Sequence, residues 1–227
     1  FNWYFDTAPE KHLANRRLYW PRGKGLGGSS SMNGMVYIRG HRADYDHWAK
    51  DLGLPGWSYD DVLPYFRKSE DFAGGDAGFH GSGGPLGITE DPSGHMLFDV
   101  FKQAARQAGI PATSDFNGAQ QEGYGSYQLT IKDGRRQSTA VTFLNAAKSR
   151  PNLTVITRAQ VKTINIDGGR AIGVTYRRGS LGGMQTVAAR REVLLCAGAV
   201  QSPQVLMQSG IGDGETLKKF GIAVKLH

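Results

Sequence analysis

Hydrophobic and polar positions follow two different rhythms along the 227 residues of this chain. In HMLFDVFKQAARQAG, residues 95–109, apolar side chains recur every three or four positions, which is the spacing of an amphipathic helix. The residues on this apolar face are Leu97, Val100, Phe101, Ala104 and Ala108. This stretch therefore predicts an amphipathic helix.

Two further helices are predicted earlier in the chain from the residues at their ends. RADYDHWAKDLG, residues 42–53, is expected to form a helix that its terminal glycine closes. In residues 55–71 Ser58 is a suitable N-cap, and Pro64 is expected to kink or break the helix that follows. The glycines of residues 73–88 are expected to serve turns more than binding.

Beyond residue 150 the rhythm changes to short runs rich in β-branched residues, which are typical of strands. Four strands are predicted, one over residues 152–157 and three more, forming a meander, over residues 159–167, 170–178 and 187–198. The sequence Asp167-Gly168-Gly169 is expected to form a tight turn between two of them.

The end of the last predicted strand, residues 193–196, is apolar throughout, as expected of a strand buried on both faces in a parallel sheet. Small residues follow it, and Ser202 and Pro203 can cap and begin the next helix. A strand, a small-residue turn and a helix start together favour a dinucleotide-type site. Cys196, the only cysteine, is interpreted as a small core residue, and a reducing compartment fits it.

Composition restricts the classes of protein that the chain can belong to. Hydrophobic residues make up 39% of the chain, enough for a globular core, and no apolar run approaches the length of a membrane-spanning helix. The net charge of +7 raises the question of nucleic acid, but the basic residues are dispersed in pairs rather than gathered in a stripe. We therefore expect no nucleic-acid partner and a cytoplasmic location, with peripheral association of the complete protein with the cytoplasmic side of a membrane left open.

The stretch GKGLGGSSSMNGMVYIRG, residues 23–40, is rich in glycine and serine, includes one asparagine and contains no acidic residue. Glycine lets a backbone come close to a bound group, and successive N–H donors can surround an anion. A lysine at the start of the run adds positive charge. The stretch therefore predicts a site for a phosphate-bearing cofactor, although a glycine run alone is equally often a flexible loop.

Residues 23–46 resemble the first signature of the glucose-methanol-choline (GMC) family of flavoprotein oxidoreductases, with Gly27, Gly28 and Asn33 at its characteristic positions. GAVQSPQVLMQSGIG, residues 198–212, resembles the second signature. Two long signatures in the right order are a specific match, and the sequence between them is also similar to the family. Within the family the resemblance is to choline dehydrogenase-like alcohol dehydrogenases.

The resemblance implies a mixed α/β and α+β fold. Residues 1–54 and 151–227, the latter with the three-strand meander, would belong to a Rossmann-like FAD-binding domain. Residues 55–150 would belong to an α+β substrate-binding domain. The only early glycine-rich run matches the first family signature rather than the strand, GxGxxG turn and helix that begin this fold, so we expect the chain to be an internal piece of a longer enzyme.

The resemblance also implies which residues would contact FAD. They are Gly27, Gly28, Ser29, Asn33, Gly34, Met35, Val36, Val161 and Ala197. Asn33 would lie near the isoalloxazine ring, and the backbone of Val161 would hydrogen-bond the adenine. Met32 occupies the position at which some members carry the histidine that links FAD covalently, so we expect non-covalent FAD. No metal site is expected.

Members of the family transfer a hydride from an alcohol carbon to the flavin while a histidine base takes the hydroxyl proton. None of the six histidines here has the sequence context of that base or of its partner, so both catalytic groups are expected beyond His227. The resemblance implies a primary alcohol as substrate, an aldehyde as product, and oxygen or a quinone as electron acceptor. Two alternatives remain: a family member that performs lyase chemistry with FAD as a scaffold, and a basic binding module without chemistry.

Overall fold

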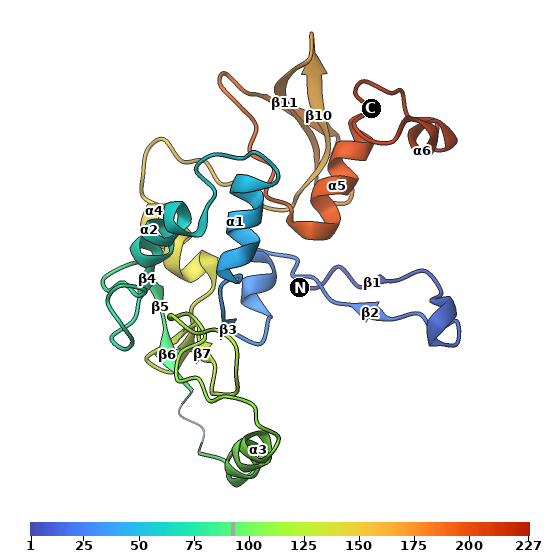
Figure 1. The fold of residues 1–227 in the computed structure, drawn as a ribbon. Helices are drawn as coiled ribbons and strands as arrows, with labels where there is room; N and C mark the ends of the chain where they lie inside the picture. The colour runs from blue at the N-terminus through green and yellow to red at the C-terminus, as the bar shows by residue number, and fades with distance from the viewer. Residues whose placement is uncertain (92–93) are drawn as a thin grey trace. The chain divides into compact units, whose positions relative to one another are not determined.

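The computed structural model describes residues 1–91 and 94–227, which form two compact units, Phe1–Leu153 and Thr154–His227 (Figure 1). Each unit is described by itself. Among the described residues, no helix is long and apolar enough to cross a membrane.

The strands described in the first unit are only two residues long, and they form four small sheets. The pairs are β1 (Phe5–Asp6) with β2 (Tyr19–Trp20), β4 (Glu70–Asp71) with β5 (Leu86–Gly87), and β8 (Ile131–Lys132) with β9 (Arg135–Arg136). The fourth sheet is antiparallel, in the order β3 (Val36–Tyr37), β7 (Gln128–Leu129), β6 (Thr89–Glu90). This sheet places the end of the glycine run against a segment about ninety residues further along.

Three helices of the first unit agree with the sequence prediction. They are α1 (Arg42–Lys50), α2 (Tyr59–Ser69) and α3 (Met96–Gln107), with shorter turns η1 (Lys11–Leu13), η2 (Gly28–Ser31), η3 (Ala140–Leu144) and α4 (Asn145–Ala147). Ser58 caps α2 as predicted, since its hydroxyl accepts from the N–H of Asp61 and the Asp61 carboxylate accepts from the N–H of Ser58. Pro64 does not break α2, which continues to Ser69.

The helix α3 has the predicted bounds, but its apolar face is exposed. Leu97, Val100 and Phe101 are 63%, 56% and 62% exposed, and only Ala105 of this helix is buried. The amphipathic spacing therefore predicted the helix correctly, while the described residues do not cover the face that the spacing defines.

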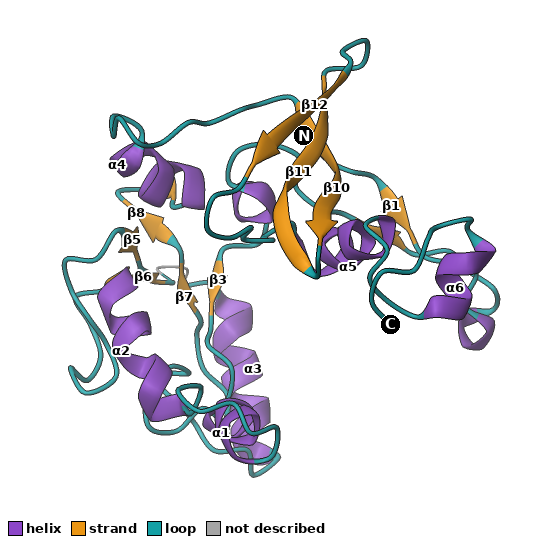
Figure 2. Ribbon diagram, turned by 90° about the horizontal axis from the view of Figure 1, so that it is seen from above, coloured by secondary structure: helices purple, strands orange, loops and turns teal. Residues whose placement is uncertain are grey.

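The second unit contains the predicted meander: β10 (Ala159–Asp167), β11 (Arg170–Arg178) and β12 (Met184–Ala188) are antiparallel neighbours in that order (Figure 2). The predicted turn between the first two strands is confirmed, because Gly168 and Gly169 have φ of +52° and +75°, which a two-residue hairpin loop favours. The third strand, however, begins and ends earlier than predicted.

One predicted strand and the end of another are wrong. Residues 152–157 form no strand, and residues 193–196 have no regular secondary structure and pair with no strand among the described residues. Leu194 is 76% exposed and Cys196 is exposed, so the cysteine is not a core residue. A strand can be buried on both faces only between paired neighbours, and the described residues supply none for this segment.

The helix α5 (Gly198–Gln208) follows, and the last helix is α6 (Gly214–Lys219). The predicted helix start was wrong: the N-cap is Ala197, so Ser202 and Pro203 lie inside α5. α5 packs against β10 (Figure 2), where Oγ of Ser209 accepts from the N–H of Ile164 at 2.8 Å and donates to the carbonyl of Val205.

Candidate cofactor-binding site

The glycine run folds into a tight turn that leads into η2. Gly27 and Gly28 have φ of +86° and +52°, a region of backbone conformation that glycine adopts easily. A Cβ on Gly27 would lie 2.4 Å from Oγ of Ser31, whereas a Cβ on Gly28 would meet nothing within 4 Å. Gly27 is therefore needed for the shape of the turn, and Gly28 leaves its outer side open to an approaching group.

The side chain of Asn33 is held by two donors. Its Oδ1 accepts from the backbone N–H of Met35 at 3.2 Å and from Nη1 of Arg136 at 2.8 Å. The same Arg136 nitrogen donates to the carbonyl oxygens of Asn33 at 2.7 Å and of Ser30 at 3.3 Å. Both groups that contact the Asn33 amide, the Met35 N–H and Nη1 of Arg136, are donors. The oxygen Oδ1 therefore faces them, and the amide nitrogen Nδ2 faces away.

Thr139 holds the other end of the turn. Its backbone N–H donates to Oγ of Ser30 at 3.0 Å, and its hydroxyl donates to the carbonyl of Gly27 at 3.4 Å. The hydroxyl of Ser30 donates to the same carbonyl. The start of the turn is thus hydrogen-bonded to a segment more than a hundred residues away along the chain.

Sequence reasoning missed both Arg136 and Thr139 as residues of this site. They lie in GRRQST, residues 134–139, and no local pattern connects that stretch with the glycine run. The one available signal was that GRRQST itself resembles the family sequence. The β3–β7 pairing and the hydrogen bonds of Arg136 and Thr139 show that the fold brings the two segments together.

Met35 has φ of +63°, which is unusual for a residue with a side chain. Its carbonyl accepts from the backbone N–H of Thr130 at 2.8 Å and from the Thr130 hydroxyl at 3.2 Å. The next residue, Val36, begins β3 and is 45% exposed. Unfavourable backbone conformations that neighbours hold in place gather at functional sites, which fits the predicted role of this segment.

Several donors of the loop point to no acceptor. Within residues 1–91 and 94–227, the backbone N–H groups of Gly27 and Gly34 and the Nδ2 group of Asn33 donate no hydrogen bond. A Cβ on Gly34 would meet nothing within 4 Å, so this part of the loop is also open. Ser29 differs, since its hydroxyl accepts from the N–H of Gly23 at 3.1 Å. Free donors without a nearby carboxylate suit phosphate and carbonyl oxygens, so the loop fits a flavin nucleotide.

The two remaining predicted cofactor residues lie in the second unit. Val161 is 39% exposed and lies in β10, an edge strand of its sheet. The pairing of β10 with β11 is irregular next to Val161. Part of the Val161 backbone therefore faces away from the sheet. Ala197 precedes α5, whose first N–H groups receive no side-chain cap. Uncapped N–H groups at a helix start also suit an anion. Contact between these residues and a cofactor stays a prediction.

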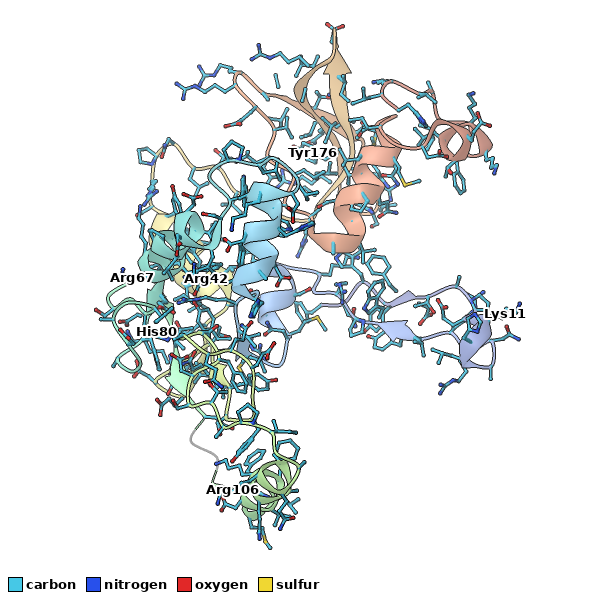
Figure 3. The ribbon with its side chains drawn as sticks, in the orientation of Figure 1. Lys11, Arg42, Arg67, His80, Arg106 and Tyr176 are labelled. Atoms are coloured by element: carbon cyan, nitrogen blue, oxygen red, sulfur yellow. The ribbon has the colours of Figure 1, made fainter. Side chains whose placement is uncertain are left out.

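A buried charge network includes Arg39, which lies near the end of the glycine run. Arg39, Glu70 and His80 are 6%, 0% and 4% exposed (His80 is labelled in Figure 3). Nη2 of Arg39 lies 2.8 Å from Oε1 of Glu70, and that oxygen also accepts from the N–H of Gly81 at 2.7 Å. The His80 ring lies between two carboxylates, with Nδ1 3.2 Å from Glu70 and Nε2 2.8 Å from Asp115.

The network shifts the pKa values of its members. Burial alone would lower the pKa of His80, but the two carboxylates outweigh it and the pKa is raised. Burial likewise opposes ionisation of Glu70, yet its bonds to His80, Gly81 and Arg39 hold its pKa below the ordinary value. Polar side chains surround the network on the side of β7. Asn117 and Gln128 are both buried, and Gln128 donates to Asp115 at 2.9 Å.

Comparison with known proteins gives a consistent result. The family model described as GMC oxidoreductase matches residues 8–227. The oxygen-dependent choline dehydrogenase of Serratia proteamaculans (strain 568) is 50% identical over 224 residues, which are 98% of this chain and 40% of that protein. The chain therefore spans 40% of the length of the curated relatives that it matches.

Solved structures agree with the sequence match. The crystal structure of pyridoxine 4-oxidase from Mesorbium loti superposes with a TM-score of 0.91 at 34% identity, covering 99% of this chain and 44% of that one. An FAD-dependent oxidoreductase from Chaetomium thermophilum gives 0.91 at 30% identity, covering 99% and 41%. These likenesses confirm the predicted fold class, part of a flavoenzyme FAD-binding domain with mixed helix and sheet content.

Proposed function

The chain belongs to the GMC oxidoreductase family, and from this membership we propose that it supplies part of the FAD site of an enzyme that oxidises an alcohol. The observation that carries the proposal is the loop between Gly27 and Val36. It has open glycines, free donors and no carboxylate, and hydrogen bonds from Arg136 and Thr139 hold its shape. Bound FAD would accept the hydride that leaves the alcohol carbon.

The proposed roles of the site residues follow from their positions. Gly28 and Gly34 allow the cofactor to come close, and the Nδ2 group of Asn33 donates to it. Ser29, Met35 and Val36 complete the surface along the flavin. In the second unit the backbone of Val161 would hydrogen-bond the adenine, and the small Ala197 leaves the start of α5 accessible.

The proposed division of labour along the chain is that residues 1–54 and 151–227 bind FAD and residues 55–150 contribute to the substrate side. The proposed substrate is a primary alcohol of choline type, because the relatives at 50% identity are named as choline dehydrogenases. The catalytic base is proposed to lie beyond His227, and oxygen or a quinone to re-oxidise the flavin. A cytoplasmic location, with association of the complete enzyme at the membrane surface, belongs to the same proposal.

The experiment that tests the activity is anaerobic titration of the full-length protein that contains this chain. The flavin absorbance near 450 nm should bleach when choline or another primary alcohol is added, and it should return with oxygen or a quinone. A flavin that no alcohol bleaches would favour the lyase alternative. Absence of flavin together with salt-dependent DNA binding would favour the basic binding module.

Non-covalent attachment is proposed because Met32, with a thioether side chain, precedes Asn33. A thioether lacks the nucleophilic ring nitrogen through which a histidine at this position would bind the flavin. Acid precipitation of the full-length holoenzyme should therefore release all of the yellow colour into the supernatant. Flavin fluorescence that stays with the washed, denatured protein would contradict the proposal.

A further inference from the structure

Arg136 is a charged residue that helps to hold the shape of the glycine loop, and the proposed function gives it no role towards the cofactor itself. It ends β9, which pairs with β8 through a two-residue turn at Asp133 and Gly134, with φ of +51° and +68°. A hairpin closed by two residues with positive φ holds its strands in a fixed register. The guanidinium group of Arg136 is therefore carried on a well-defined element.

Three acceptors converge on one nitrogen of this guanidinium group. Nη1 lies 2.7 Å from the carbonyl of Asn33, 2.8 Å from its side-chain Oδ1 and 3.3 Å from the carbonyl of Ser30. Hydrogen bonds from a charged donor are about twice as strong as neutral ones. Asn33 is itself exposed, so these bonds, with the N–H of Met35, are what restrict its side chain.

We propose that Arg136 is a positioning residue of the FAD site, which orients the side-chain amide of Asn33 so that Nδ2 is presented as a donor to the cofactor. The inference rests on the proposed function for the identity of the ligand. An amide that could turn over would present oxygen as often as nitrogen, and oxygen would repel the acceptor atoms of a flavin. Arg136 excludes the turned-over form, because it would set Nδ2 against a cationic donor.

The neighbouring Arg135 provides a matched control. It lies on the same strand and is exposed, and among the described residues its side chain makes no hydrogen bond or ion pair. In the full-length apoenzyme, Arg136→Ala should weaken FAD binding about ten- to hundredfold, the range expected for losing bonds from a charged donor. Arg135→Ala should change the affinity by less than about twofold. Equal affinities for the two variants would overturn the proposal.

A double-mutant cycle separates action through Asn33 from a general effect on the loop. If Arg136 acts through the amide, Arg136→Ala should weaken FAD binding much less when Asn33→Ala is already present. The spectrum of bound FAD should shift in the same way in both single variants, because both remove the oriented donor. Fully additive losses of affinity, with different flavin spectra, would contradict this role.

Two further variants distinguish positioning from folding. Arg136→Lys retains one charged donor and should recover part of the affinity, whereas Asn33→Asp keeps the bond to Arg136 but offers oxygen outward and should bind FAD poorly. Hydrogen exchange of residues 27–35 in the apoenzyme should be faster in Arg136→Ala and unchanged in Asn33→Asp. Unchanged hydrogen exchange in Arg136→Ala would overturn the positioning role of Arg136, and this test does not require FAD to bind. Failure of the wild-type protein to bind FAD would instead refute the proposed function.

Discussion

His80 is a buried imidazole that faces two carboxylates, and one of these, Glu70, is fully buried. Glu70→Gln would leave the positive charges of Arg39 and His80 without their shared partner. Removing one member of a buried ionic network costs about 3–5 kcal/mol, so urea unfolding of the full-length protein should show a loss in this range. The matched control is Asp60→Asn, which removes an exposed ion pair with Arg42 and should cost about 1 kcal/mol or less.

His80 and Glu70 also make the stability of the protein depend on pH. A raised His80 pKa contributes stability that is complete below the unfolded value of about 6.5 and is lost as pH rises through the folded value. The lowered Glu70 pKa contributes stability above about pH 4.3 that is lost at more acidic pH. Tyr37 is half-buried with its hydroxyl group enclosed, and burial raises its pKa to about 12, so it stays neutral throughout this range.

The stability advantage of the wild type over His80→Gln should therefore be largest between about pH 4.3 and 6.5 and should shrink above neutrality. Denaturant unfolding of both proteins across this range measures it. An advantage that grows towards pH 9 would mean that His80 is neutral in the folded protein, contrary to the contacts observed.

For single residues, the sequence predicted roles that depend on neighbours a few positions away, and it missed roles that depend on partners distant along the chain. Ser58 was predicted as a cap from its residue type and position, and its partner Asp61 is only three positions away. Arg136 pairs with Asn33 across more than a hundred residues, and Glu70 pairs with Arg39 across 31. No periodicity encodes such pairs, so they could come only from the fold.

Among the elements, the contact between α5 and β10 includes one buried hydroxyl, that of Ser209. Oγ of Ser209 bridges the N–H of Ile164 in the strand and the carbonyl of Val205 in the helix. Ser209→Ala leaves a buried donor unsatisfied and should destabilise the full-length protein by about 1–3 kcal/mol, with faster hydrogen exchange at Ile164. Ser202→Ala is the control, because Ser202 lies inside α5 and should change stability by less than about 0.5 kcal/mol. A larger loss for Ser202→Ala would instead support the helix start predicted from the sequence.

The elements also show where periodicity is sufficient. The spacing of apolar residues predicted α3, and the Gly168-Gly169 turn predicted the β10–β11 hairpin, because both elements form by local contacts. The apolar run at residues 193–196 has the composition of a buried parallel strand, but a strand exists only where neighbours pair with it. The prediction failed there because pairing is a property of the sheet rather than of the segment.

For the whole molecule, the exposed face of α3 and the division of the proposed FAD-binding residues between two units predict how residues 1–227 would behave when produced alone. The chain spans 40% of its relatives' length, and the base expected beyond His227 would be absent. We therefore expect no alcohol-dependent dye reduction and at most weak retention of added FAD.

The apolar side chains of α3, with Phe101 62% exposed, should also make the chain self-associate. Replacing Leu97 and Phe101 by lysine should reduce that association in analytical ultracentrifugation without restoring turnover. Stoichiometric FAD with turnover in the isolated chain would show that a complete site and a base lie within these residues.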